Sequence, residues 1–270
     1  MSSRTSLSIA EEYGLTQRPP IALRFFLLAT LTVFCAALSP AQVESSQFVD
    51  RQLAPQQHVS INQLLTPEKA KKATEKARED LAHGRFDSAL REAERALDIF
   101  PRCATALSIE GAVNLLRTNY AEAGREFQRA IDADPALGSA YLGLGMALTS
   151  EGRFKDALVP LDRAATFLPT SWTVHFEAAL ARLGVGESEA ALKEITYAER
   201  FAPSDPKKQS GVALLRGVAL LQMNDRSGAK ANLAETIERD SNGIYAALAR
   251  ERLAQFDDGQ TAHSTVPSPF

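Results

Sequence analysis

Residues 138–171 read GSAYLGLGMALTSEGRFKDALVPLDRAATFLPTS, and this stretch decides the fold. In its first part, apolar residues such as Tyr141 and Leu144 recur at spacings of three and four, which places them on one face of a helix. Gly152 follows, a residue that can adopt the left-handed conformation with which many helices end. A second apolar pattern then runs until Pro169 interrupts it, because proline lacks the N–H group that a helix requires. The stretch therefore predicts two helices joined by a short turn.

The same unit recurs along the chain with a fixed period. Proline stands at Pro101, Pro135, Pro169 and Pro203, each 34 residues after the one before. A constant period of this size is typical of proteins in which each repeat packs only against its neighbours. The periodicity therefore predicts one all-α solenoid, whereas a length of 270 residues would otherwise favour two domains.

The residues at fixed places within the period resemble the tetratricopeptide repeat (TPR). In the clearest unit the places of the family hold Tyr141, Leu144, Gly145, Leu148, Ala157, Leu161, Ala164 and Pro169. Two of these places, one in each helix, are filled in the other units by the pairs Ala77 and Ala93, Gly111 and Phe127, Ala179 and Ile195, and Gly217 and Leu233. The resemblance implies a right-handed α-solenoid of antiparallel helix pairs. It has about five TPR-like units and a capping helix from Ile244 to Phe256.

Local signals refine this frame. Thr66-Pro67 resembles an N-cap followed by proline at the first helical position, and Asp205-Pro206 repeats the signal. The interval from Pro203 to Ser241 is 38 residues, four more than the period, and four residues are about one helical turn. We therefore expect the first helix of the fifth unit to begin near Pro206 and to be one turn longer. Pro160 is expected to kink its helix without ending it.

The N-terminus has a different composition. Phe25 to Leu38 is a run of 14 residues without a charge, shorter than the roughly 20 residues of a transmembrane helix. Arg18 and Arg24 precede it, and Ser39-Pro40-Ala41 places small residues where a signal peptidase would cleave. These features predict that residues 1–41 are a secretory signal peptide and that the protein is periplasmic or secreted. The alternative is an uncleaved segment that anchors the protein in a membrane.

Three further segments complete the predicted organisation. Residues 42–65 are polar and show no helical period, so they are predicted to form a flexible lead. Residues 66–256 are predicted to form the solenoid. Residues 257–270 contain little apolar content and are predicted to be a disordered tail.

The sequence predicts no catalytic, cofactor or metal site. The formal net charge is −3 and no basic block is present, so nucleic acid is not an expected partner. No two histidines are four residues apart, and neither a Cys-x-x-Cys nor a His-Glu-x-x-His motif occurs, so zinc-binding spacing is absent. Cys35 would leave with the signal peptide, and Cys103 alone cannot form an internal disulfide. We therefore predict that the protein is not an enzyme.

The resemblance implies that the first helix of each unit lines a concave groove. The frame places eight apolar residues there, namely Leu142, Met146, Phe176, Leu180, Leu183, Leu214, Val218 and Leu221. Because none is charged, we expect a solvent-facing apolar strip that binds an apolar or amphipathic segment as a helix. The alternative for each residue is a core position turned toward a neighbouring helix. A further alternative is that the lead of the same chain, Val43 to Leu65, occupies the groove.

These observations favour a non-catalytic protein–protein interaction scaffold of the cell envelope. The partner is expected to be a protein or peptide, with membrane contact only if the N-terminal segment is retained. Two alternatives stay open. The protein can be an accessory subunit or regulatory domain of an envelope enzyme or of a secretion or assembly complex, or it can be a self-assembling structural repeat protein.

Overall fold

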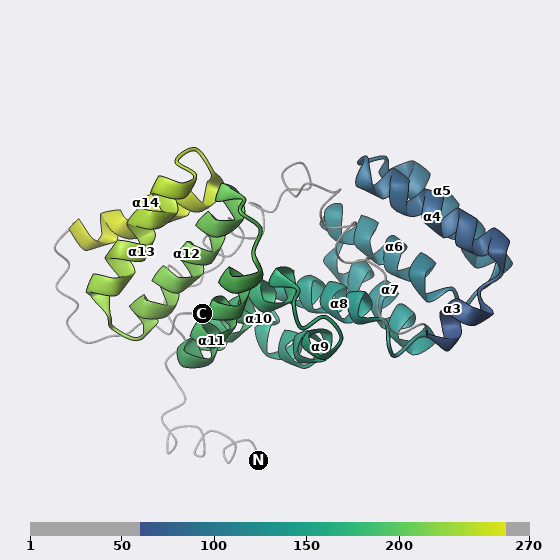
Figure 1. Cartoon of the computed structure of the whole chain (residues 1–270), viewed down its shortest axis with the longest axis horizontal. Helices are drawn as coiled ribbons and strands as arrows, with labels where there is room; N and C mark the ends of the chain where they lie inside the picture. The colour runs from purple at the N-terminus through teal and green to yellow at the C-terminus, as the bar shows by residue number, and fades with distance from the viewer. Residues whose placement is uncertain (1–59, 258–270) are drawn as a thin grey trace, which may run out of the picture. The chain divides into compact units, whose positions relative to one another are not determined.

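The computed structural model describes residues 60–257, and the regular structure of that range is helical. The helices, drawn in Figure 1, are α3 (Ile61–Leu65), α4 (Glu68–Ala82), α5 (Phe86–Ile99), α6 (Ala104–Leu116), α7 (Tyr120–Ala133), α8 (Gly138–Ser150), α9 (Phe154–Phe167), α10 (Trp172–Gly184), α11 (Ser188–Phe201), α12 (Pro206–Gln222), α13 (Arg226–Arg239) and α14 (Ile244–Asp257).

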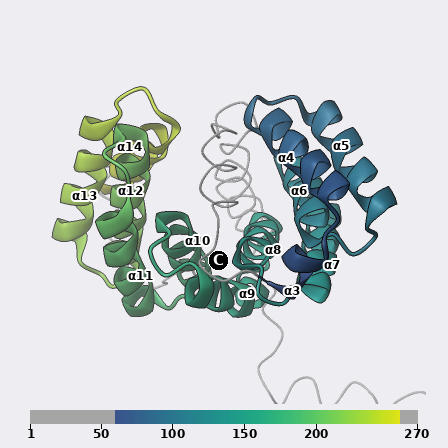
Figure 2. The same cartoon turned by 45° about the vertical axis from the view of Figure 1, so that its right-hand side comes forward.

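Consecutive helices form the predicted units. The pairs α4–α5, α6–α7, α8–α9, α10–α11 and α12–α13 pack most extensively, and α14 packs against α13 and α12. Each first helix also contacts the first helix of the next unit, so α4, α6, α8, α10 and α12 make one layer. Figure 2 shows this layer on the inner side of the array, with the second helices outside it. The predicted all-α solenoid of helix pairs with a closing helix is confirmed.

All five units use the same turn between their helices. Gly84, Gly152 and Gly186 have φ values of 70°, 74° and 82°, in the left-handed region. In the second and fifth units the equivalent residues are Thr118, at φ 64°, and Asn224, at φ 63°. The amide after this residue closes the turn by donating to a carbonyl five residues earlier, as Arg153 does to Leu148 at 2.9 Å. The left-handed conformation predicted for Gly152 is confirmed.

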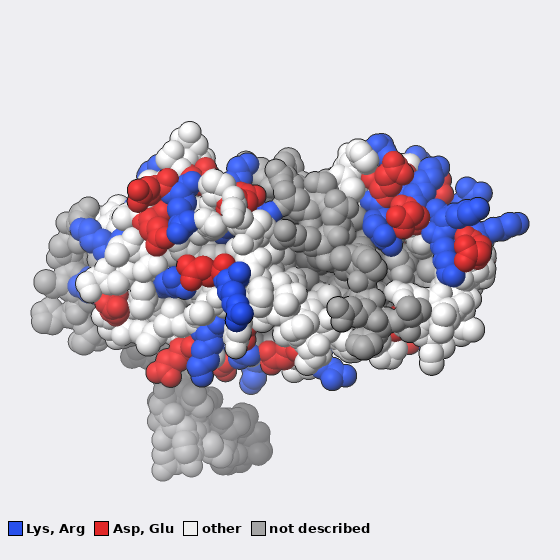
Figure 3. Space-filling model, in the orientation of Figure 1, with Lys and Arg blue, Asp and Glu red and all other residues white. Residues whose placement is uncertain are grey.

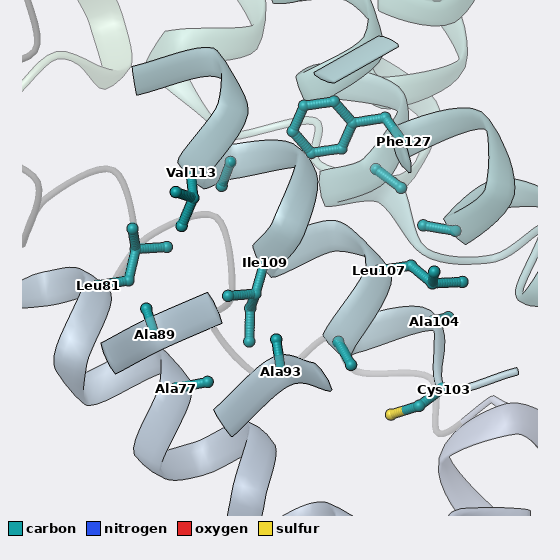
Figure 4. Packing of buried hydrophobic residues seen from close by; sticks show 14 of the residues in the cluster. Ala77, Leu81, Ala89, Ala93, Cys103, Ala104, Leu107, Ile109, Val113 and Phe127 are labelled. Carbon is teal, nitrogen blue, oxygen red and sulfur yellow. The ribbon is translucent and has the colours of Figure 1, made fainter. Parts of the chain in front are cut away.

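The core depends on the close approach of the two helices of a unit. Leu161 of α9 lies against Gly145 of α8, where an added Cβ would be only 2.5 Å from the leucine side chain. Ala157 and Ala164 of α9 are buried on the same side, as the frame predicts. Figure 4 shows the same packing at the first units, where small residues of α4 and α5 meet Ile109 of α6.

Of the two predicted helix start signals, Asp205-Pro206 is confirmed. The Asp205 side chain accepts a hydrogen bond from the Lys207 amide at 2.9 Å and caps α12. With 17 residues, α12 is one turn longer than α6, α8 or α10, each of which has 13. The other signal differs from the prediction, because Pro67 is the residue at the start of α4 and Thr66 instead ends α3. The helix α9 continues through Pro160.

The end of the predicted lead is a helix. Ser60 and Gln63 form a reciprocal capping box that starts α3. The Asn62 side chain donates to the Arg102 carbonyl at 2.6 Å and accepts from the Ala104 amide at 3.2 Å, which fixes α3 to the turn between α5 and α6. Apolar periodicity could not reveal α3, since its three large apolar side chains, Ile61, Leu64 and Leu65, are all exposed. The spacing of Ser60 and Gln63, which fits a capping box, was the sequence signal that could have indicated α3.

Several sequence predictions concern other parts of the chain. The predicted signal peptide of residues 1–41, residues 42–59 of the predicted lead and residues 258–270 of the predicted tail lie outside the described residues. From residue 60 to residue 257, no helix is both long enough and apolar enough to cross a bilayer.

The left-handed turns generate a first prediction. Thr118 is β-branched, so its positive φ strains the backbone. Its side chain is exposed, so burial does not compensate for this strain. Thr118→Gly should raise the free energy of unfolding by about 1 kcal/mol. Urea denaturation followed by circular dichroism measures the change.

The matched control is Asn224→Gly, at the equivalent turn of the fifth unit. Asparagine adopts the left-handed conformation more readily than threonine, so this variant should gain less. A loss of stability on Thr118→Gly, or a larger gain at Asn224, would contradict the assignment of strain.

Candidate functional site

The structure places the eight predicted groove residues on α8, α10 and α12, but it does not leave them as an open strip. Leu142, Phe176, Leu183 and Leu214 are buried. The other four are half-buried and none is exposed. The expectation of a solvent-facing strip of eight residues is therefore wrong. Only Met146, Leu180, Val218 and Leu221 keep accessible surface, and we call these four residues the inner row.

The burial has a direct cause in the packing of successive first helices. Leu142 shares a core cluster with Leu161 of α9 and with Val174 of α10. It is therefore a core residue, and the alternative interpretation holds for it. Met146 packs at the edge of this cluster and at the edge of the preceding one, which explains why it stays half-buried. Met146 thus lies where two core clusters meet.

Three aromatic side chains gather at the C-terminal part of the inner layer, and we call them the aromatic end. The rings of Trp172 and Phe176 on α10 have centroids 5.8 Å apart and meet edge to face. The ring of Tyr245 on α14 meets Phe176 in the same way at 6.5 Å. Gly211 of α12 lies beneath, since a Cβ added there would be 2.9 Å from Tyr245 and 3.3 Å from Phe176. Trp172 thus lies at the junction of the fourth and fifth units, with Lys208 of α12 over its ring.

The carboxyl group of Glu177 lies beside the aromatic end. The residue is 5% exposed, and no hydrogen bond or ion pair joins its carboxyl group to any residue from 60 to 254. Burial raises the pKa of Glu177 to about 7. Burial, followed by the nearby charge of Glu177, also raises the pKa of the Tyr245 hydroxyl. Sequence reasoning missed Glu177, because the repeat frame selected apolar residues and nothing in the local pattern indicates its burial.

His175, in contrast, is fully partnered. Its Nδ1 lies 2.8 Å from Glu194 Oε2 and its Nε2 lies 3.0 Å from the Pro169 carbonyl oxygen. Both partners are acceptors, so a protonated ring satisfies both. Burial lowers the pKa of His175, but the bonds to Glu194 and Pro169 outweigh it and raise the pKa overall. His175 thus links α10 to Glu194 of α11 and to the turn that follows α9.

The remaining candidates are structural. Cys103 is buried in the turn between α5 and α6, and burial raises the pKa of its thiol. Within the described range, no group of three or more histidine, cysteine, aspartate or glutamate side chains is arranged to hold a metal ion.

Comparison with known proteins decides the family. A model of the tetratricopeptide repeat matches residues 74–138 and 117–171, inside the five helix pairs described above. The matched part of the chain therefore consists of tetratricopeptide repeats. Superkiller protein 3 of Schizosaccharomyces pombe is 31% identical over 86 residues, which are 32% of this TPR protein and 6% of the relative. The chain therefore spans only a small part of that relative.

Several solved structures share the fold of this TPR protein. YrrB, described as a TPR protein with an unusual peptide-binding site, is 22% identical with a TM-score of 0.55, covering 67% of this chain and 92% of YrrB. The pilF protein of Pseudomonas aeruginosa is 20% identical with a TM-score of 0.58, covering 71% and 85%. The APC/C hetero-tetramer Cut9–Hcn1 is 16% identical with a TM-score of 0.59, covering 80% and 42%. At these identities the likeness establishes the fold alone.

The charges of the TPR array are mixed. Figure 3 shows lysine, arginine, aspartate and glutamate interleaved over α4 and α5, where Lys71 pairs with Glu68 at 2.9 Å and Lys76 with Glu92 at 2.6 Å. The outer face of this terminal unit is highly charged. Such surface pairs contribute little stability, and they keep an end unit from exposing apolar surface.

The pKa of Glu177 gives a second prediction. Because the carboxyl group holds its proton more tightly in the folded chain, the contribution of Glu177 to stability is greatest below pH 4.5 and falls as the pH rises to about 7. The difference between these pKa values corresponds to at most about 3 kcal/mol. Glu177→Gln should flatten the decline between pH 5 and 8, measured by urea denaturation at several pH values.

Glu110 provides the matched comparison for this prediction. Burial and the charge of Glu126 raise the pKa of Glu110 to about 7 as well. Glu110→Gln should therefore remove a separate part of the loss of stability that occurs as the pH rises. The imidazolium of His175 contributes in the same direction, since its pKa is raised too. A pH profile unchanged by Glu177→Gln would show that the carboxyl group is solvated in the folded protein.

Proposed function

We propose that this TPR protein is a non-catalytic scaffold that binds an apolar or amphipathic helical segment of a protein partner along the inner row. Tetratricopeptide-repeat proteins bind protein or peptide partners in general. The observation that carries the finer proposal is the inner row itself. Its half-buried apolar residues come from α8, α10 and α12, which are adjacent first helices of three successive units.

The chemistry of the inner row favours an apolar helix as the guest. Met146, Leu180, Val218 and Leu221 carry no charge, so a guest need not supply polar partners to them. An amphipathic helix presents apolar side chains at spacings of three and four and can lay that face on such a surface. Met146 adds a flexible, polarisable side chain that adapts to different guests.

The buried residues beneath the inner row support the same proposal. Leu183 and Leu214 are almost completely buried, so they form a firm base that does not need to rearrange when a guest binds. A preorganised surface binds with less loss of conformational entropy than a mobile one. YrrB, which shares the fold, is described as having a peptide-binding site, and this makes a peptide guest a reasonable expectation for the present array.

The proposed location is the cell envelope, which is the periplasm in a bacterial cell. The support comes from the sequence of residues 1–41, with its basic residues, its short uncharged stretch and its small residues before Gln42. The guest is then expected among proteins of the same compartment.

A photo-crosslinking amino acid at position 146 tests the groove. In cells that express the protein natively, it should form a covalent adduct with a partner protein, and Leu180→Glu together with Val218→Glu should abolish that adduct. Circular dichroism first establishes that the double variant is folded. The crosslinker is placed at position 146 because Met146 is accessible. Phe176 is buried, and a crosslinker in its place would disturb the core.

Val159 provides the control position. It is an apolar residue on the outer helix α9 with 71% of its surface exposed. The crosslinker at position 159 should give no adduct with the same partner, and Val159→Glu should leave the adduct at position 146 intact. Equal crosslinking at both positions, or an adduct that survives the double variant, would show that the partner binds elsewhere.

The location has a separate test. If residues 1–41 are a signal peptide, the protein isolated from its source should begin near Gln42 when its intact mass is measured. The physical reason is that a 14-residue uncharged stretch is too short to hold the chain stably across a bilayer. Recovery of the chain with Met1 in the membrane pellet would instead establish the anchored alternative.

A further inference from the structure

We infer that the aromatic end of the inner layer, with Glu177 beside it, is a subsite for one cationic side chain, lysine or arginine, of the bound segment. The Glu177 carboxylate is the counter-ion, and the rings of Trp172, Phe176 and Tyr245 flank the cation. This inference rests on the proposed function and specifies the chemistry of the partner.

The first argument is the missing partner of Glu177. A carboxylate removed from water is stabilised only by hydrogen bonds or an opposite charge, and no residue from 60 to 254 supplies either. The nearby cations are already engaged elsewhere. Arg182 pairs with Asp162 at 2.8 Å, and Lys208 lies 3.5 Å from Asp205. No positive charge contributes to the pKa of Glu177, so neither cation offsets its burial. A basic side chain of a guest would supply the missing counter-charge.

The second argument is the kind of surface that surrounds the carboxyl group. Aromatic faces attract cations because of the negative charge above the ring plane. Trp172 already shows this behaviour, since Lys208 Nζ lies 5.7 Å from its ring centroid. Trp172 and Tyr245 are half-buried, so both rings keep accessible surface, and the charge of Glu177 acts on the Tyr245 hydroxyl. A carboxylate beside aromatic rings suits lysine or arginine, and it disfavours an acidic guest residue by charge repulsion.

The third argument is the place of the subsite. Leu180 of the inner row follows Glu177 by three residues on α10, so both lie on one side of that helix. Gly211 of α12 lets the rings of Phe176 and Tyr245 lie close to that helix, which holds the aromatic end against the inner layer. A segment that lies on the inner row can therefore place its apolar side chains on Leu180 and Val218 and one basic side chain at Glu177.

The geometry also predicts a pH signature for binding. A cation binds the ionised form of Glu177, whose pKa in the free protein is about 7. Tyr245 on α14 is the described titratable group whose pKa responds to the charge of Glu177, and its own pKa is raised, so it stays neutral near pH 7. Affinity for a basic guest should therefore increase as the pH rises from 6 to 8, and binding near pH 6 should release a proton.

The experiment selects guests without assuming their sequence. A phage library of random 16-residue peptides is panned on the full chain, and the selected peptides are synthesised. We expect them to combine an apolar helical stripe with at least one lysine or arginine. Glu177→Gln should weaken a selected peptide about tenfold, and replacement of its basic residue by norleucine should weaken it to the same extent. The two changes together should have little further effect, because they remove the same interaction.

Matched variants separate this inference from the proposed function. Glu110→Gln, which changes another carboxyl group of raised pKa on α6, should leave peptide affinity unchanged. Glu177→Asp keeps the charge and should weaken binding less than Glu177→Gln. If selected peptides lack basic residues, or bind Glu177→Gln as well as the parent, the subsite is wrong although the inner row can still bind them. If no peptide is selected, or binding survives Leu180→Glu with Val218→Glu, the proposed function itself is wrong.

Discussion

The close approach of helices at glycine residues is the constraint on which the rest of the structure depends. Phe127 of α7 lies against Gly111 of α6 and Gly143 of α8, and an added Cβ would come within 3.0 Å and 2.3 Å of its ring. Phe154 of α9 reaches Gly184 of α10 in the same way. A large side chain on a second helix thus fills space that a glycine leaves on a first helix, either in its own unit or in the next. This contact both closes a unit and fixes how the following unit stacks.

The same close packing limits what the inner layer can offer to a partner. When successive first helices approach so closely, part of each inner face is used to hold the array together, as Leu142 shows. The surface left for binding is a set of half-buried residues on a dense base, rather than an open apolar strip. Dense packing beneath a binding surface has an advantage, because the surface is already in its bound shape. The inner layer therefore offers a partner less apolar contact area, but that area is already preorganised for binding.

The period of 34 residues predicted a large part of this structure, since equivalent places in each unit pair across the same interface. The contacts of Gly145 with Leu161 and of Gly217 with Leu233 join places that the repeat frame had marked. Gly143 and Gly184 were not marked, because they stand outside the recurring places and serve only particular neighbours. Periodicity also identifies the face of a helix but not the depth at which a residue lies. For this reason the inner residues were placed on the right helices while their exposure was overestimated.

The buried carboxyl group of Glu177 illustrates why such a site escapes sequence reasoning. An unpaired acid in the layer of first helices opposes folding near neutral pH, so a pattern based on stability predicts an apolar residue there. In a solenoid, however, each internal unit is stabilised by its interfaces with two neighbours. These interfaces can offset a loss of stability at one position. The fourth unit has such support on both sides, from the third and from the fifth. Its neighbours can therefore hold a residue that is unfavourable in the free protein and becomes favourable when an opposite charge binds.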